Sequence, residues 1–154
     1  LAGASAQLIE KLPVKLRSSP ANELIAALRS LDESRLQFKP KIDPSKLANA
    51  LDCYGSGVAP ESVLALYDDT IFRGAKDGFF ITQDGIYWHN QFAAPAMLSF
   101  EDIQSVTFSE GWATTAVVIN DAEINISMAD NKNRFVRGFA ESLQPFAVPS
   151  TKSL

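Results

Sequence analysis

Acidic side chains gather in one short segment of the chain, residues 68–90. The segment holds the only histidine of the sequence, His89, and four aspartates: Asp68, Asp69, Asp77 and Asp84. Carboxylates that converge in a folded chain can serve as a general acid and a general base. The segment therefore raises one enzymatic hypothesis, a catalytic or small-ligand site that uses the aspartate cluster around Asp69 and Asp77.

The same aspartates also have a structural explanation. Asp84 stands before Gly85, and an Asp-Gly pair readily adopts the positive φ angles of a hairpin turn. Asp77 stands before a glycine at the start of a strand, and Asp69 can end a strand through local bonds between its side chain and the backbone. We favour this explanation and predict that the protein has no catalytic residues.

Other kinds of chemistry find little support in the sequence. With one histidine and one cysteine, Cys53, the ligands for a zinc or copper site are missing, and residues 68–78 lack the spacing of a calcium-binding loop. The sequence contains no nucleophile elbow and no phosphate-binding or dinucleotide-binding glycine motif. We therefore predict no metal and no cofactor, and we expect His89 to be a partly exposed strand residue that faces outward beside Tyr87.

Charge is distributed unevenly along the 154 residues, which suffice for one domain and an accessory segment. Residues 1–60 carry eight basic and six acidic side chains, whereas residues 61–154 carry six basic and twelve acidic ones. Nucleic acids are bound by clustered lysines and arginines that neutralise phosphates. The acidic second part therefore argues against a nucleic-acid partner.

Targeting signals and membrane spans are not evident in the sequence. No apolar run approaches the roughly 20 residues of a membrane-spanning helix, and the first residues lack the pattern of a secretory signal. A single cysteine allows no internal disulfide. We expect a soluble, cytoplasmic protein for which a membrane partner is unlikely, and the leucine at position 1 indicates a partial or processed chain.

Helices are predicted in residues 1–57, an accessory helical segment. Ser19 and Asp43 each precede a proline and then apolar residues at helical spacing, which is typical of a capped helix start. Gly55 is a helix stop. A weaker helix is expected over residues 4–11.

Short strands are predicted after a glycine- and proline-rich connection at residues 53–62. The spacing of the strands, with tight turns between most of them, indicates an antiparallel sandwich or partly open barrel. The last hairpin is expected to turn at Asn120 and Asp121. The seven predicted strands lie within residues 62–68, 78–84, 85–90, 96–100, 103–109, 113–120 and 122–127.

One more helix follows the strands. Asp130 or Asn131 can cap it, and its apolar stripe includes Phe135 and Phe139. We expect this stripe to cover an open end of the barrel. The predicted organisation is thus a helical segment at 1–57, a strand-rich domain at 58–148 and a tail at 149–154.

This order of elements resembles that of pleckstrin-homology-like (PH-like) domains, which have seven antiparallel strands and a C-terminal helix. The text "ALYDDTIFRGAKDGFFITQDGIYWHN", followed by "LSFEDIQSV", is similar to a bacterial PH-like family. The shared features are an Asp-Asp-Thr turn, a Lys-Asp-Gly start of the second strand and a "T-x-x-G-I-Y" hairpin. The resemblance covers residues 62–144 and implies an α+β fold, a seven-stranded partly open barrel capped by a helix.

The resemblance implies a binding or scaffold module rather than an enzyme, with a protein partner or a homo-oligomer. Lipid-binding members carry several basic residues in the loop between their first two strands. Here that loop has Arg73 and Lys76 against three aspartates, so lipid-headgroup binding is expected to be weak. Arg73 and Lys76 remain candidate binding residues.

Two apolar side chains are further candidates for protein contact. Trp112 follows a glycine in a turn between strands, where it is either an interface anchor or a cover over the barrel edge. Phe92 lies in the apolar connection "NQFAAPAM", which is either an interface or a loop packed beneath the N-terminal helices.

Overall fold

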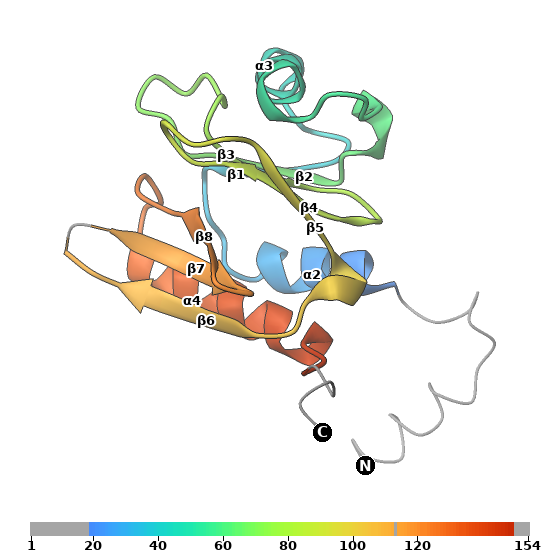
Figure 1. Ribbon diagram of the computed structural model, residues 1–154. Coiled ribbons are helices and arrows are strands. Elements are labelled where there is room, and N and C mark those ends of the chain that lie inside the picture. The colour runs from blue at the N-terminus through green and yellow to red at the C-terminus, as the bar shows by residue number, and fades with distance from the viewer. Residues whose placement is uncertain (1–18, 113, 150–154) are drawn as a thin grey trace.

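The computed structural model describes residues 19–112 and 114–149. This part of the chain has an α+β architecture with two antiparallel sheets, one of five strands and one of three (Figure 1). The helix predicted at 4–11 and residues 150–154 of the predicted tail lie outside the described residues. The strands form two separate sheets and not one closed seven-stranded barrel.

Each segment predicted to be a strand contains one, β2 to β8. The larger sheet has the order β1-β2-β3-β4-β5 and the smaller has the order β6-β7-β8. Neighbours in each sheet are antiparallel, so short connections suffice between most of them. The strands are β1 (Leu36–Phe38), β2 (Ala65–Asp68), β3 (Gly78–Ile81), β4 (Gly85–His89), β5 (Ala96–Ser99), β6 (Val106–Glu110), β7 (Thr115–Ile119) and β8 (Ala122–Asn125).

Strand β1 corrects the prediction of helices alone before residue 58. It pairs antiparallel with β2, with Leu36 opposite Tyr67 and Phe38 opposite Ala65. Three residues are too few to show an alternating pattern, so the strand depends on its partner rather than on its own sequence. The N-terminal part of the chain thus supplies an edge of the larger sheet.

Helix starts follow the predicted caps. Helix α2 (Pro20–Arg29) is capped by Ser19, and α3 (Pro44–Tyr54) is capped by Asp43 and ends at Gly55. Helix α4 (Lys132–Leu143) is capped by Asn131. In each case the side-chain oxygen accepts a hydrogen bond from a backbone N–H of the first turn that would otherwise have no partner. Single-turn 3-10 helices occupy Pro60–Ser62, Phe100–Asp102 and Gln144–Phe146.

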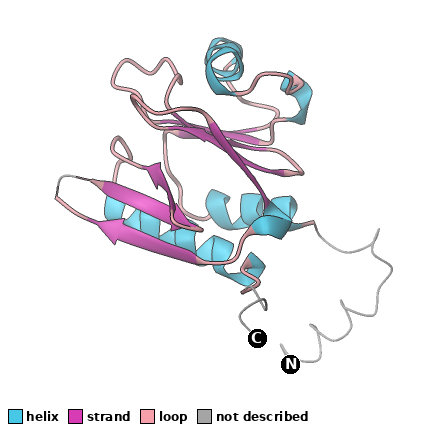
Figure 2. Cartoon of the chain, in the orientation of Figure 1, coloured by secondary structure: helices cyan, strands magenta, loops and turns pink. Residues whose placement is uncertain are grey.

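The elements enclose two apolar clusters. Helix α3 covers the outer face of the larger sheet, and Ala50 and Tyr54 pack there against Phe80 (Figure 2). The inner face of that sheet meets α2, α4 and the smaller sheet. This main cluster includes Leu24 and Leu28 of α2, Tyr67, Phe79 and Ile81 of the larger sheet, Val117 and Ile119 of the smaller sheet, and Phe135, Phe139 and Leu143 of α4.

Two hairpin turns follow different geometries. Asn120 and Asp121 both have positive φ, 50° and 70°, which matches the turn predicted at these residues. The hairpin between β3 and β4 also forms where predicted, with Thr82 N–H donating to Gly85 O at 3.1 Å. Neither Asp84 nor Gly85 has positive φ, however, so the predicted backbone angles of this turn were wrong.

Candidate functional site

Loops from both sheets meet at one end of the molecule. We call this region the loop end; it comprises the β2–β3 loop (69–77), the β4–β5 loop (90–95), the described part of the β6–β7 tip (111, 112 and 114) and the start of the β8–α4 connection (126–130). In Figure 1 these connections lie on the left of the molecule. The antiparallel order of the strands places them there, because alternate connections in each sheet lie at the same end.

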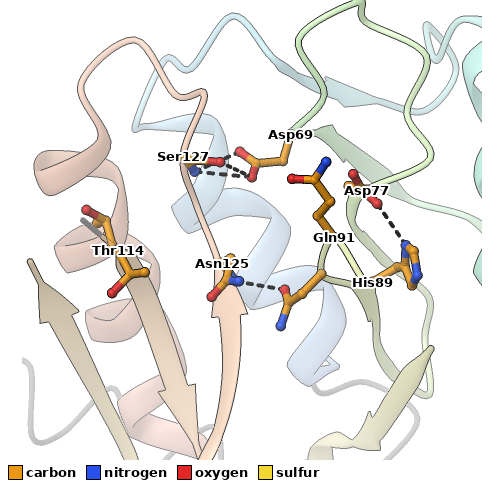
Figure 3. Close-up of a pocket in the computed structure, with 9 residues that line it drawn as sticks. Asp69, Asp77, His89, Gln91, Thr114, Asn125 and Ser127 are labelled. Carbon is orange, nitrogen blue, oxygen red and sulfur yellow. Dashed lines mark hydrogen bonds and ion pairs between the residues drawn. The ribbon is translucent and has the colours of Figure 1, made fainter. Parts of the chain in front are cut away.

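Two adjoining cavities lie between these loops. The larger, about 670 Å³, includes Ile71, Phe72, Lys76 and Met128 in its lining. The smaller, about 180 Å³, has a mostly polar lining that includes His89, Asn125 and Thr114. Four residues line both cavities: Asp69, Asp77, Gln91 and Ser127. Figure 3 shows residues of the two sheets facing each other across the smaller cavity.

Asp69 joins the two sheets at the base of the loop end. Its carboxylate accepts hydrogen bonds from Ser127 N–H at 2.9 Å, from Ser127 Oγ at 2.7 Å and from Met128 N–H at 2.9 Å (Figure 3). Tyr67 donates its phenol to the same carboxylate at 2.8 Å. Burial, and then the Asp69 carboxylate, raise the pKa of Tyr67 well above its usual value, so the phenol keeps its proton. Both Asp69 oxygens thus have protein donors.

Asp68 organises the β2–β3 loop from inside. Its Oδ1 accepts hydrogen bonds from Thr70 N–H at 2.9 Å, from Thr70 Oγ1 and from Ala75 N–H at 3.2 Å. Its Oδ2 lies 3.0 Å from the ammonium of Lys46 on α3. Burial alone would raise the pKa of Asp68, but the Thr70 hydrogen bonds and Lys46 outweigh it and lower the pKa. The local side-chain bonds to the backbone that were predicted for Asp69 are therefore made by Asp68.

His89 and Asp77 form the second polar contact of the site. His89 Nδ1 lies 2.9 Å from Asp77 Oδ1 and 2.9 Å from the Lys76 carbonyl oxygen. Because both neighbours are acceptors, Nδ1 carries the proton. Only 16% of the His89 side chain is exposed, and its ring stacks on Tyr54, so His89 is a partly exposed strand residue as predicted, but it lies against α3.

Cys53 lies near the same histidine but does not complete a catalytic relay. Its Sγ is 4.0 Å from His89 Nδ1, the nitrogen that also faces Asp77. In a nucleophile–histidine–carboxylate relay the nucleophile and the carboxylate bind opposite nitrogens of the ring. The arrangement of Cys53, His89 and Asp77 therefore cannot pass a proton from the thiol to the carboxylate through the ring.

Large apolar side chains project from the tips of three loops. Phe72 is 95% exposed, and Phe92 and Trp112 are each 96% exposed. Ile71, beside Phe72, is 71% exposed. Trp112 thus does not cover a sheet edge and Phe92 does not pack beneath the N-terminal helices, so for each the packed alternative is excluded. The structure brings these two predicted residues to the same end of the molecule.

The basic residues near the loop end divide into two groups. Arg35 Nη1 donates to the carbonyl oxygens of Asp68 and Thr70 at 3.2 and 2.8 Å, and Lys46 pairs with Asp68, so both are used within the fold. The predicted binding residues Arg73 and Lys76 are exposed on the β2–β3 loop. Lys76 lines the larger cavity, and Arg73 has a positive φ of 59° at the loop tip.

Sequence reasoning missed several residues of the loop end. Ile71 and Phe72 are exposed apolar residues in the β2–β3 loop, for which only charged binding residues were predicted. The sequence does indicate them, because two large apolar residues stand together between polar loop residues. Ser127 and Met128 had no local signal, because their bonds to Asp69 span 58 and 59 residues of the chain.

Two further features of the described residues concern metals and membranes. Over residues 19–112 and 114–149, no group of three or more histidine, cysteine, aspartate or glutamate side chains is placed to hold a metal ion. Within the same residues, no helix has the length and apolar character needed to cross a membrane.

Comparison of the chain with models of protein families, with curated proteins and with solved structures finds no match. The site is therefore interpreted from its own geometry.

Proposed function

We propose that the chain is a non-enzymatic PH-like module that binds another protein with its loop end. The observation that carries this proposal is the set of three aromatic side chains, Phe72, Phe92 and Trp112, exposed on three loops of the loop end, where Phe72 also lines the larger cavity. Burial of a large apolar side chain stabilises a complex by about 1.5–3 kcal/mol, and aromatic residues are enriched among the residues that dominate binding energy. Exposed aromatic clusters of this kind are typical of interaction surfaces.

The order of the elements supports the PH-like part of the proposal. Seven antiparallel strands, β2 to β8, are followed by the C-terminal helix α4, which is the order of elements on which the resemblance in the sequence is based. Strand β1 extends the first sheet by one edge strand. Because one fold serves many functions, the binding role rests on the loop end and not on the fold.

The state of the aspartates favours binding over catalysis. Asp69 accepts hydrogen bonds at both oxygens, so it is engaged in holding the sheets together. Asp77 is paired with His89. A general base needs a carboxylate oxygen within reach of a substrate proton, and these contacts compete with that role.

The charges favour a protein over an anionic membrane. Arg35 and Lys46 are occupied by internal partners, which leaves Arg73 and Lys76 as the cations of the β2–β3 loop. Each basic residue adds only about 1 kcal/mol of attraction to an anionic surface, and the aspartates of the loop oppose it.

The test is a capture experiment with the full chain and a loop-end variant. The variant combines Phe72→Ser, Phe92→Ser and Trp112→Ser, which alter side chains that are at least 95% exposed and so leave the core unchanged. Phe108→Ser with Val148→Ser is the control, because both residues are exposed apolar side chains outside the loop end. The full chain and the control should retain the same partners from cells that make the protein, and the loop-end variant should lose them. Partners retained equally by all three proteins would contradict the proposal.

A further inference from the structure

We infer a second contact surface that is separate from the loop end: the free edge of β5 (Ala96–Ser99) pairs antiparallel with β5 of a second copy of the chain. The two larger sheets would then continue into each other across a two-fold axis. The inference does not rest on the proposed function, because the pairing uses the backbone of residues 95–99, whereas the proposed protein contacts are made by the side chains of Phe72, Phe92 and Trp112.

Three of the four sheet edges in the described residues are protected. At β6, Gln144 donates its side-chain amide to the Val106 carbonyl, and Arg137 pairs with Glu110. At β8, Asn90 donates to the Glu123 carbonyl at 2.8 Å and accepts from Asn125 N–H at 2.9 Å.

The edge at β1 is protected by shortness and by charge. It has three residues and is flanked by Arg35 and Lys39. Bonded side chains, charges and short strands are the usual means by which proteins keep a sheet edge from pairing with another chain.

The edge at β5 has neither bonded side chains nor charges, and it is one residue longer than β1. Residues 90–100 contain no charged side chain, and Met97 is 41% exposed. Phe100 N–H donates to the Asp84 carbonyl at 3.2 Å, in register with the β4–β5 pairing. Since bonded and non-bonded pairs alternate along an antiparallel ladder, Met97 directs its N–H and C=O away from β4. No described residue supplies a partner for them.

One register of self-pairing uses every free backbone group of this edge. With Met97 opposite Met97 of the second copy, the two residues exchange both backbone hydrogen bonds, and Pro95 comes to lie opposite Ser99. Pro95 has no N–H but has a free carbonyl, whereas Ser99 begins the 3-10 turn at Phe100–Asp102, which uses its carbonyl. The position where Pro95 has no N–H therefore lies opposite the Ser99 carbonyl, which already accepts a hydrogen bond. The Ser99 N–H of one copy donates to the Pro95 carbonyl of the other.

The side chains suit the same register. Ala96 of one copy lies opposite Leu98 of the other, so a small residue faces a large one on the half-buried inner face. On the outer face, the two Met97 side chains lie together beside an apolar cavity of about 250 Å³, whose lining includes Tyr54 and Tyr87.

Charge explains why a second copy fits this edge. The chain has a net charge of -4, so two copies repel each other through most of their surface. At the β5 edge no like charges meet, because the strand and the loop before it are uncharged. An uncharged strand is complementary to itself in a two-fold antiparallel pair.

The test is self-association of the full chain, measured by sedimentation from about 1 µM to about 1 mM, the range that suits a small interface. We expect the mass to rise from one chain to two, with slower hydrogen exchange at the Met97 and Ser99 amides as the dimer forms. Met97→Lys, which places two ammonium groups opposite each other, should weaken the dimer by about tenfold or more. The matched control is Thr107→Lys, which adds the same charge at an exposed position of edge strand β6 and should leave the dimer unchanged.

Two results would overturn the inference. The first is a single chain across the whole range, and the second is a dimer that persists unchanged in Met97→Lys. The loop-end variant separates this inference from the proposed function, because it keeps β5 intact. A dimer lost in that variant and kept in Met97→Lys would assign self-association to the loop end and refute the β5 pairing.

Discussion

At the scale of single residues, Asp69 links two sheets that are distant in the sequence. Its carboxylate holds Ser127 and Met128 at the start of the β8–α4 connection, and it also accepts the Tyr67 phenol. If this carboxylate is replaced by a weaker acceptor, several of these hydrogen-bond donors lose their partner. The loop end therefore depends on Asp69 for its shape, whatever binds there.

Asp69→Asn should lower the free energy of unfolding by about 1–3 kcal/mol, because an amide offers one acceptor oxygen in place of two and its NH₂ faces protein donors. Urea unfolding followed by fluorescence measures the change. The matched control is Asp77→Asn, which disturbs a single contact with His89 and should cost less. Equal stability of Asp69→Asn and the unaltered chain would refute the structural role and reopen the enzymatic hypothesis for this aspartate.

Asp68 should make stability depend on acidic pH. Burial opposes its ionisation, but Thr70 and Lys46 lower its pKa in the folded protein below the unfolded value of about 3.9. The ionised form therefore stabilises the fold, fully above the unfolded pKa, and this stabilisation is lost as the pH falls through the folded pKa. Asp68→Asn should be less stable at neutral pH and should lose less stability on acidification.

The measurement is urea unfolding at a series of pH values from neutral pH downward through the unfolded pKa of about 3.9. Glu110→Gln serves as the control. The hydrogen bond from Arg137 lowers the pKa of Glu110 as well, but this pair is exposed and screened by solvent, so its contribution is small. The same acid dependence in Asp68→Asn and in the unaltered chain would show that Asp68 does not contribute.

At the scale of elements, the start of β3 depends on a glycine. Gly78 has a φ of +138°, and a Cβ at this position would lie 2.0 Å from the Tyr67 carbonyl oxygen of β2. Gly78→Ala should therefore lower stability by about 2–4 kcal/mol, because it adds a backbone clash to an unfavourable φ. Thermal unfolding compares it with Gly57→Ala, where φ is +83° and no atom lies within 4 Å. That control isolates the backbone cost of about 1 kcal/mol, and equal effects of the two variants would contradict the clash.

Local patterns account for the elements that could be predicted from sequence. Caps at Ser19 and Asp43 and the seven strand segments depend on neighbouring residues, so they can be read from the chain. Strand β1 could not, because three residues between Arg35 and Lys39 have no visible period and take their conformation from β2.

The candidate site was predicted less completely than the fold. Arg73, Lys76, Phe92 and Trp112 were selected by type and by their place in loops, and the structure places them at the loop end. The cavities between the loops were not foreseen, since they depend on contacts across the two sheets such as Asp69 with Ser127. Such contacts join residues that are far apart in the sequence, and no repeating pattern in the sequence indicates that they meet.

At the scale of the whole molecule, the charges around the loop end predict little attraction to anionic membranes. Arg35 and Lys46 are bonded within the fold, and the aspartates oppose Arg73 and Lys76. Sedimentation with phosphatidylserine vesicles at low salt should leave the protein in the supernatant. Binding that falls as salt is added would contradict this prediction and would favour lipid-headgroup recognition.

The loop end is the surface on which the account as a whole depends. Three aromatic side chains on separate loops are exposed there, one of them in the lining of the larger cavity, and no described part of the chain buries them. A photoreactive phenylalanine placed at Phe92 or Trp112 would report directly on what meets this surface in cells that make the protein. The same group at Phe108, an exposed aromatic position on β6, is the matched control. We predict cross-links to a discrete protein from positions 92 and 112 and none to that protein from position 108; no protein cross-link at either loop position, or equal cross-links at all three, would contradict the account.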